Sequence, residues 1–158
     1  TGEQGSGWAY DGYIITAKHV VEGTKQIDIF TDDLQRSVTG GIEYIDDELD
    51  LAVLRVAKTL PSVTLGDSDA LIEGEKLVSI TSPKGAQNVV EECTFAGKLV
   101  TETQNDLNIS DTITLGGSSG GAVFNHNSEL IGMIYGGYEG MSQVIPANKL
   151  KAILKNLK

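Results

Sequence analysis

The stretch Gly116-Gly117-Ser118-Ser119-Gly120-Gly121 places two serines between two pairs of glycines in a chain of 158 residues. Glycine permits positive φ angles and the close approach of other groups, so a serine in such a turn can present its hydroxyl beside backbone N–H donors. Acyl-transfer sites need this combination, because the attacked carbonyl oxygen develops negative charge. Gly-Ser runs are also common in flexible loops, so the segment on its own leaves both interpretations open.

A nucleophilic serine needs a general base, and the chain has two histidines. His19 follows the apolar run Tyr13–Ala17, which has the pattern of a buried strand, so its ring would be held at a strand end. His126 lies in Asn125-His126-Asn127-Ser128, where Asn and Ser predict a turn. We expect His126 to be a solvated turn residue. His19 is the candidate base, with a satisfied core histidine as the alternative.

A carboxylate is needed to orient that base, and Asp50 stands at the entrance to the apolar run Leu51–Val56. It is either the last residue of a solvated loop or a group placed to orient the histidine. The preceding acids Asp46, Asp47 and Glu48 lack the regular ligand spacing and the glycine turn of a calcium loop. We therefore expect a solvated acidic turn, without a metal ion or cofactor, and single out Asp50.

The chain order His19, Asp50, Ser119 is the order of the chymotrypsin-type serine proteases. Thr16-Ala17-Lys18-His19 resembles the Thr-Ala-x-His segment of that superfamily, and Asp50-Leu51-Ala52-Val53-Leu54 resembles its Asp-Ile/Leu-Ala-Leu/Val-Leu segment. Gly117-Ser118-Ser119-Gly120-Gly121 matches Gly-x-Ser-Gly-Gly. Three motifs in one order are specific, so the chain is identified as resembling this superfamily.

Within the superfamily the chain is most similar to the protease domain of the HtrA/Deg family. The segments that carry the likeness are Gly5-Ser6-Gly7-Trp8, Asp11-Gly12-Tyr13-Ile14-Ile15-Thr16, Leu65-Gly66-Asp67-Ser68-Asp69, Glu73-Gly74-Glu75-Lys76-Leu77-Val78-Ser79-Ile80 and Ile145-Pro146-Ala147-Asn148. The family usually has Asn-Pro-Gly-Asn before the nucleophile, where this chain has Leu115-Gly116-Gly117-Ser118. We expect no PDZ domain in the chain and no long N-terminal loop that would build a trimer, so oligomerisation and regulation are not inferred from the likeness.

The resemblance implies a mechanism and an oxyanion hole. His19 would take the proton of Ser119 and Asp50 would fix the imidazole tautomer, while the backbone N–H groups of Gly117 and Ser119 would bind the oxyanion. Ser118 stands where digestive members of the superfamily have an aspartate that pairs with a new N-terminus. Activation by N-terminal trimming is therefore not expected.

The resemblance also implies a substrate pocket. Ile113 would form its base, Leu115 and Ile134 would border it, and Tyr135 and Gly136 belong to the segment that resembles its wall. An aspartate at the base would select Arg or Lys, and glutamyl endopeptidases of the staphylococcal type have a histidine where Ile134 stands. We expect small or medium aliphatic residues at the cleaved position.

Glycine content and short apolar runs separated by turn residues predict an all-β fold. With the resemblance, we expect two six-stranded antiparallel β-barrels and a short C-terminal helix. Residues 1–61 would form the first barrel with His19 and Asp50, residues 62–75 the linker, and residues 76–158 the second barrel with Ser119. The expected strands are 5–10, 13–17, 25–31, 34–39, 41–45 and 51–56, then 76–81, 92–101, 107–112, 121–124, 130–136 and 141–145. Leu150, Ile153, Leu154 and Leu157 recur at helical spacing and predict a terminal helix docked on the second barrel, with a membrane-surface helix as the alternative.

Charge and cysteine content narrow the partners. A net charge of −10 repels phosphate backbones and anionic lipid, so nucleic-acid binding is not expected. Cys93 is the single cysteine, so no intrachain disulfide forms. No apolar run is long enough to span a bilayer and no signal peptide is visible. Family likeness favours an extracytoplasmic bacterial protein, and leaves open a homo-oligomer, a regulatory domain or an upstream membrane anchor.

The sequence therefore predicts a serine endopeptidase that acts through an acyl-enzyme on unfolded or exposed protein segments. One alternative is a catalytically silent relative that uses its cleft to bind peptides or as a sensor. Another is esterase action on small molecules.

Overall fold

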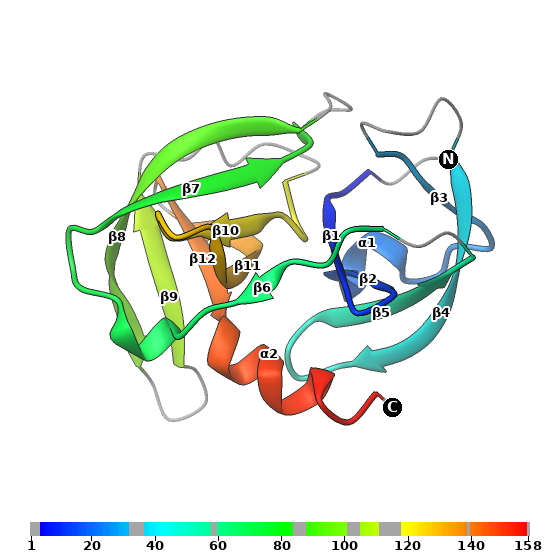
Figure 1. Cartoon of the computed structure of the whole chain (residues 1–158). Helices are drawn as coiled ribbons and strands as arrows, with labels where there is room; N and C mark the ends of the chain where they lie inside the picture. The colour runs from blue at the N-terminus through cyan, green and yellow to red at the C-terminus, as the bar shows by residue number, and fades with distance from the viewer. Residues whose placement is uncertain are drawn as a thin grey trace.

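Two β-sheets lie side by side in the computed structural model, with a single turn of helix in one half and a longer helix at the C-terminus (Figure 1). The structure describes residues 4–31, 37–57, 60–83, 88–100, 105–110, 118–138 and 140–157. The first sheet comes from the N-terminal part of the chain and the second from the C-terminal part.

The first sheet has five strands in the order β1-β2-β5-β4-β3. Their bounds are β1 Gly7–Tyr10, β2 Tyr13–Ala17, β3 Ile27–Ile29, β4 Val38–Asp46 and β5 Leu51–Val56. The hairpin between β1 and β2 turns at Asp11 and Gly12, both of which have positive φ. Because two central residues with positive φ match the twist of the flanking strands, the Asp-Gly pair explains this tight turn.

The first sheet departs from the expected six strands at β4. We expected separate strands at 34–39 and 41–45, but one strand runs continuously from Val38 to Asp46 through Gly40 and Gly41. Instead of ending the strand at these glycines, the chain continues and absorbs the irregularity in a bulge between Ile42 and Tyr44. Residues 34–36 lie outside the described residues. In the described part the first unit is thus an open half-barrel of five strands.

The second sheet closes on itself. Its strands are β7 Lys76–Thr81, β8 Val89–Val100, β9 Asn105–Ser110, β10 Ala122–Phe124, β11 Glu129–Tyr138 and β12 Met141–Pro146. Strand β10 pairs with both β7 and β11, which completes a six-stranded antiparallel barrel in the order β10-β7-β8-β9-β12-β11. A seventh strand, β6 Thr64–Leu65, pairs in parallel with β11 and lies in the stretch predicted to be the linker.

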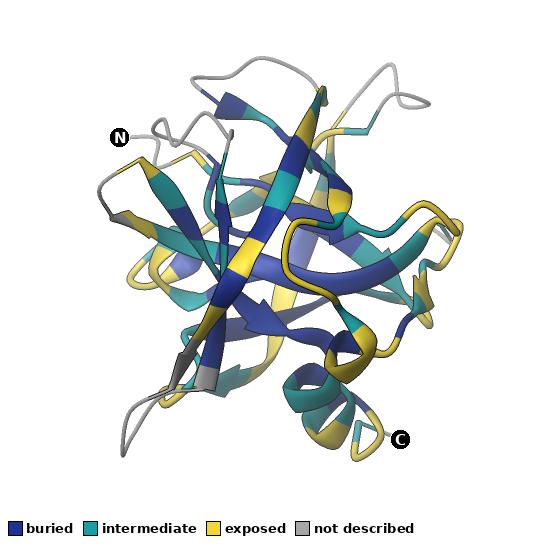
Figure 2. Cartoon of the chain, turned by 90° about the vertical axis from the view of Figure 1, so that its left-hand side faces the viewer, coloured by how far each residue is buried: buried dark blue, intermediate teal, exposed yellow. Residues whose placement is uncertain are grey.

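The all-β class with a double-barrel architecture and a C-terminal helix is confirmed. Strands β2, β5 and β7 have the predicted bounds. Strands β2 and β5 could be predicted because each is a nearly continuous run of apolar residues, and both are mostly buried. In β7 the side chains alternate between the two faces of the sheet, as its burial shows. Figure 2 shows the same bands of buried and exposed residues along the strands.

Three apolar clusters hold the two sheets. One fills the closed barrel around Phe95, Ile109 and Ile131, and includes the buried side chain of Cys93. A smaller one lies in the half-barrel around Ile14 and Leu54. The third joins the halves: Trp8, Ile15, Leu51 and Val53 from the first sheet pack with Ala122, Leu130, Met133 and Ile145 from the second.

Helix α2, Ala147–Leu154, docks on this shared cluster through Leu150 and Leu154, as the spacing of the leucines predicted. Asn148, in its first turn, fixes the linker: its backbone N–H donates to Ser68 Oγ (3.0 Å) and its side-chain amide donates to Asp67 Oδ1 (2.8 Å). Two motifs far apart in the sequence therefore meet. Among the described residues, no helix is long and apolar enough to cross a bilayer.

The Asn148–Asp67 contact predicts a pH-dependent stability. The Asn148 amide, and then the backbone N–H of Asp69, hold the pKa of Asp67 below its usual value. A carboxyl group with a lowered pKa stabilises the folded state above its unfolded-state pKa and loses this contribution as the pH falls. We expect Asn148→Ala to lower the melting temperature at pH 7, and the difference from the unsubstituted protein to narrow below about pH 4.

Thermal unfolding followed by circular dichroism between pH 3 and pH 7 checks this. Asn156→Ala is the matched control, because Asn156 donates to the Ala152 carbonyl and, within the described part of the chain, to no carboxylate. The change in melting temperature caused by Asn156→Ala should be the same at every pH between 3 and 7. An equal loss of melting temperature for Asn148→Ala at every pH would contradict the expectation.

Candidate active site

Strand register brings His19 and Asp50 together. β2 and β5 pair in antiparallel fashion with Ala17 opposite Leu51, so the residue after β2 faces the residue before β5. The backbone N–H of Lys18 donates to the Asp50 carbonyl at 2.8 Å, which extends the hydrogen bonding between β2 and β5 by one residue pair. His19 follows in the helical turn α1, Lys18–Val21.

The Asp50 carboxylate makes two hydrogen bonds with His19. Its Oδ1 accepts from the His19 backbone N–H at 2.9 Å, and its Oδ2 lies 2.5 Å from the ring Nδ1. An ionised carboxylate only accepts, so the proton of a neutral His19 ring belongs on Nδ1 and Nε2 keeps its lone pair. The His19 side chain is 47% exposed, so substrates can reach the ring.

Asp50 adopts a positive φ of 53° to make these contacts. Aspartate is one of the few residues other than glycine that tolerates this region, and such conformations are found at functional sites. The preceding turn is built by Asp46, whose Oδ1 accepts from the backbone N–H groups of Glu48 and Leu49, both at 3.0 Å. Asp47 pairs with Lys18 at 2.6 Å. Asp47 and Glu48 are exposed in the turn, as predicted, whereas Asp46 ends β4 and is half-buried.

Ser119 lies in a tight turn that contacts both halves of the molecule. The Ser119 carbonyl accepts from the backbone N–H of Ser6 at 2.8 Å, just before β1. On the other side the Gly120 N–H donates to the Ile134 carbonyl (2.7 Å), and the Ile134 N–H donates to the Gly121 carbonyl (2.9 Å). The turn is therefore held between the start of the half-barrel and strand β11.

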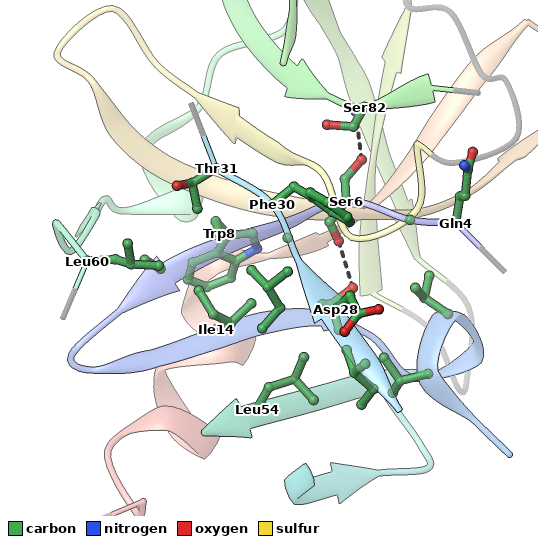
Figure 3. Close-up of a pocket in the computed structure, with 18 of the residues that line it drawn as sticks. Gln4, Ser6, Trp8, Ile14, Asp28, Phe30, Thr31, Leu54, Leu60 and Ser82 are labelled. Atoms are coloured by element: carbon green, nitrogen blue, oxygen red, sulfur yellow. Dashed lines mark hydrogen bonds between the residues drawn. The ribbon is translucent and has the colours of Figure 1, made fainter. Parts of the chain in front are cut away.

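Ser6 connects this turn to the histidine strand. Its carbonyl accepts from Thr16 Oγ1 at 2.6 Å, and Thr16 lies three residues before His19. Its own hydroxyl accepts from the backbone N–H of Ser82 at 2.8 Å, at the end of β7. Both contacts are drawn in Figure 3. Ser6 is buried and bonds to three separate segments of the chain.

Gly120 allows the close approach. It has a φ of +90°, and a Cβ there would lie 2.0 Å from the Ser6 carbonyl oxygen and 2.6 Å from Thr16 Oγ1. Both distances are shorter than a non-bonded contact between carbon and oxygen, so a side chain does not fit here. Glycine is therefore required both for the positive φ and for the space. This contact seats the residue after Ser119 directly against strand β2.

The other predicted site residues fall into three groups. Ile113, Leu115 and Gly117 lie outside the described residues, so their pocket and oxyanion roles stay predictions. Ile134, only 2% exposed, packs in the core of the closed barrel, and Gly136 follows the bulge in β11. His126 is exposed in a turn built by the Asn125 side chain, as predicted.

Tyr135 belongs to a polar cluster that the sequence did not suggest. Its hydroxyl donates to Asp106 Oδ2 at 2.5 Å, and Lys149 Nζ lies 3.3 Å from Asp106 Oδ1. Asp106 is only 5% exposed, so its charge needs both partners. Burial, followed by the bond to the Asp106 carboxylate, raises the pKa of Tyr135. The three residues come from β9, β11 and α2, which no local sequence pattern relates.

Among the described residues, no group of three or more His, Cys, Asp or Glu side chains is arranged to hold a metal ion. The His19 imidazole and the Asp50 carboxylate are in direct contact, and Ser119 lies in a turn bonded to Ser6, which also bonds to Thr16 of the strand that ends before His19. An imidazole held by a carboxylate can accept a proton from a hydroxyl, which is the chemistry that a serine nucleophile requires.

Comparison with known proteins agrees with this arrangement. The family described as the trypsin-like peptidase domain matches residues 5–133. A DegP-like periplasmic serine endoprotease of Hahella chejuensis is 36% identical over 166 residues, covering 98% of this chain and 35% of the relative. A DegP-like relative from Chlamydia trachomatis is 33% identical over 162 residues, covering 93% of this chain and 32% of the relative.

Solved structures show the same likeness. The HtrA-type protease AlgW with a decapeptide superposes with a TM-score of 0.86 at 28% identity, over 97% of this chain and 51% of that one. AlgW with a tripeptide superposes with a TM-score of 0.85 at 28% identity, over 97% of this chain and 55% of that one. The chain spans about a third of the length of the curated relatives it matches, at 35% and 32%.

The close contact at Gly120 predicts that adding a methyl group at this position lowers the stability of the protein. We expect Gly120→Ala to lower the free energy of unfolding by about 3 kcal/mol or more, because positive φ strain adds to overlap with the Ser6 carbonyl. The control is Gly74→Ala, which has a φ of +89° but nothing within 4 Å of the added carbon, and about 1 kcal/mol is expected there. Urea unfolding measures both values, and equal losses would contradict the close approach.

The Asp106 cluster predicts a second stability difference. Tyr135→Phe should lower the free energy of unfolding by about 1–3 kcal/mol, because a buried carboxylate loses a donor. Tyr13→Phe is the control, since the Tyr13 hydroxyl donates to the neutral Leu157 carbonyl at 3.1 Å, and its loss should cost about 1 kcal/mol or less. If the two variants unfold at the same urea concentration, the cluster does not depend on the tyrosine.

Proposed function

The chain belongs to the trypsin-like peptidase domain family, and on this premise we propose that it is a serine endopeptidase of the HtrA/DegP type. In this proposal Ser119 is the nucleophile, His19 is the general base and Asp50 orients the imidazole. The peptide bond is cleaved through an acyl-enzyme that water then hydrolyses. No cofactor or metal ion takes part in the proposed steps.

The single observation that carries the proposal is the paired contact between Asp50 and His19. The two carboxylate oxygens bond to the backbone N–H and to the ring Nδ1 of the same residue, at 2.9 and 2.5 Å. This leaves Nε2 to take the Ser119 proton, and it puts a negative charge beside the imidazolium that forms. A histidine that served only to fill space would not require both contacts.

The acylation step follows from these assignments. The Ser119 oxygen attacks the carbonyl carbon of the peptide bond while its proton passes to His19 Nε2, and the carbonyl oxygen becomes an oxyanion. The backbone N–H groups of Gly117 and Ser119 would bind that oxyanion. His19 then returns the proton to the leaving amine as the carbon–nitrogen bond breaks.

The substrates are proposed to be unfolded or exposed protein segments. Support comes from the peptides held by the similar AlgW structures and from the relatives named as endoproteases. The apolar pocket expected from Ile113, Leu115 and Ile134 favours aliphatic residues at the cleaved position, with Tyr135 and Gly136 in its wall. Relatives named as periplasmic enzymes support an extracytoplasmic location.

Active-site labelling tests the catalytic assignment. A fluorophosphonate probe should label the protein on Ser119, and Ser119→Ala should abolish labelling and lower kcat/KM for peptide cleavage by about 10⁴-fold or more. Ser118→Ala is the control that distinguishes the two adjacent serines, and it should keep the label. Retained labelling in Ser119→Ala would contradict the assignment. A protein that binds peptides but takes no label would be the silent relative instead.

Specificity is tested separately with a peptide library digested by the unsubstituted enzyme. Cleavage should concentrate after Val, Ile, Leu or Ala, because a pocket without a charged group does not offset the desolvation of a charged side chain. Cleavage mainly after Lys, Arg, Asp or Glu would contradict the pocket assignment while leaving the nucleophile assignment intact.

A further inference from the structure

A buried carboxylate outside the proposed triad connects three elements of the C-terminal half. Asp106 lies on β9, which pairs with β12, and β12 leads directly into α2 (Figure 1). The Asp106 side chain is bonded to the Tyr135 hydroxyl of β11 and lies beside Lys149 of α2. Replacing a buried ion pair by apolar residues is often neutral or stabilising, so stability alone does not explain a carboxylate at this position.

Tyr135 is the extra residue of a β-bulge. In the antiparallel pairing of β11 with β12 the register shifts between Ile134 and Gly136, so Tyr135 has no opposite residue in that described strand. A bulge interrupts the hydrogen bonding between two strands and redirects a side chain, and bulges are common next to active sites. The bond from the Tyr135 hydroxyl to Asp106 therefore anchors β11 at the point where its pairing is interrupted.

The residue before the bulge holds the serine turn. The Ile134 carbonyl accepts from the Gly120 N–H at 2.7 Å, and the Ile134 N–H donates to the Gly121 carbonyl at 2.9 Å. Ser119 directly precedes these two glycines. A shift of the bulge would move the peptide groups of Ile134, and with them the backbone that carries the Ser119 hydroxyl.

The Tyr135 ring also lies near the other members of the proposed triad. It packs against the apolar cluster shared by the two sheets, as does Leu49, the residue before Asp50. Burial, then the bond to Asp106 and its charge, and finally the charge of Asp50 raise the pKa of Tyr135. The hydroxyl therefore keeps its proton at neutral pH and remains a donor to Asp106.

We propose that Tyr135, held by Asp106 and Lys149, is a positioning residue for the nucleophile: its hydroxyl bond fixes the bulge of β11 and so places Ser119 relative to His19. This inference rests on the proposed function, because it concerns the same triad. Lys149 holds the Asp106 carboxylate in its orientation, so α2 contributes to the support of the active site. In this role the Tyr135 hydroxyl acts through the backbone and not on the reacting atoms.

The test separates positioning from stability. Tyr135→Phe keeps the ring and removes the bond to Asp106. Well below the melting temperature of each variant, we expect it to lower kcat for peptide cleavage and the rate of fluorophosphonate labelling, each about tenfold, because small displacements of reacting groups slow catalysis strongly. KM should change by less than about twofold, because the ring keeps its place in the expected pocket wall.

Tyr13→Phe is the matched control. The Tyr13 hydroxyl donates to the Leu157 carbonyl just after α2, so the same atom is lost from a second tyrosine that supports the C-terminal segment. That bond does not involve β11 or Asp106. The kcat and the labelling rate of Tyr13→Phe should therefore equal those of the unsubstituted protein.

Two substitutions of Asp106 test whether the hydrogen bond is the cause. Asp106→Asn keeps an oxygen that can accept from the Tyr135 hydroxyl, and it should retain kcat to within about threefold. Asp106→Leu has a similar shape without an acceptor and should lower kcat about tenfold. Combining Asp106→Leu with Tyr135→Phe should lower kcat no further, because both substitutions remove the same bond. If Asp106→Leu does not fold by circular dichroism, the comparison of Tyr135→Phe with Tyr13→Phe decides the proposal.

Amide hydrogen exchange measures the same displacement independently of catalysis. The N–H groups of Gly120 and Ile134 should exchange several-fold faster in Tyr135→Phe than in the unsubstituted protein, because the bulge that supports them is released. The N–H of Phe95, which donates to the Glu75 carbonyl at 2.9 Å in the closed barrel, is the internal reference. Its exchange should change less than that of Gly120 and Ile134.

The possible failures are distinguishable. Equal kcat in Tyr135→Phe and Tyr13→Phe would overturn the positioning role and leave the proposed function intact. Equal acceleration of exchange at Gly120, Ile134 and Phe95 would overturn it too, because it would indicate a loss of stability throughout the protein. A raised KM with unchanged kcat would assign Tyr135 to substrate binding instead. An unsubstituted protein that neither cleaves peptides nor takes the label would contradict the proposed function, and this proposal with it.

Discussion

In the proposed mechanism, the position of Ser119 relative to His19 and Asp50 depends on the contact between the serine turn and the start of the half-barrel. His19 and Asp50 lie beside strands of the first sheet, and Ser119 lies in a turn held by β11 of the second, so the proposed triad requires the two halves to be held in fixed positions. The Ser6 N–H to Ser119 carbonyl bond joins them at 2.8 Å, and the bond from Thr16 to the Ser6 carbonyl ties the same point to the strand that ends at His19. Groups that act together in catalysis must be placed to within about 0.5 Å, which a direct hydrogen-bonded contact can achieve.

A second set of contacts supports this joint from outside. The apolar cluster shared by the two sheets buries side chains from both, and α2 covers it through Leu150 and Leu154. Asn148 fastens the helix to the segment that connects the halves. Asp106 bonds to Tyr135 of β11, the strand that also holds the serine turn, and to Lys149 of α2. The helix is therefore bonded directly to the connection and, through Asp106 of β9, to β11, the strand that holds the serine turn.

Much of this arrangement could be predicted from local sequence. Short apolar runs located β2 and β5, and the leucine spacing located α2, because these patterns are local in the sequence. His19 and Asp50 could be paired because each borders an apolar run, and the register of β2 and β5 then brings them together. The triad roles of the three residues remain a proposal that this geometry supports.

The rest could not be predicted, because it depends on contacts between distant segments. Ser6 has no distinctive chemistry in the sequence, and its importance comes from bonds to Thr16, Ser82 and Ser119. Asp106 looks like a surface residue until β9 is placed against β12. Glycines 40 and 41 favoured a break that pairing with β5 overrides. In each case contacts between distant segments determined which of several local conformations of similar free energy the chain adopts.

The central claim is that His19, Asp50 and Ser119 act as one catalytic unit across the joint between the two sheets. The most direct test compares kcat/KM for peptide cleavage in three variants. Two carry the single substitutions Ser119→Ala and His19→Ala, and the third is a triple variant that combines both of these with Asp50→Asn. If the three residues act as a unit, the triple variant should be no slower than Ser119→Ala, because the base and its orienting group have no role without the nucleophile. The account would be contradicted if the fold-reduction in kcat/KM of the triple variant were the product of the reductions caused by the separate substitutions.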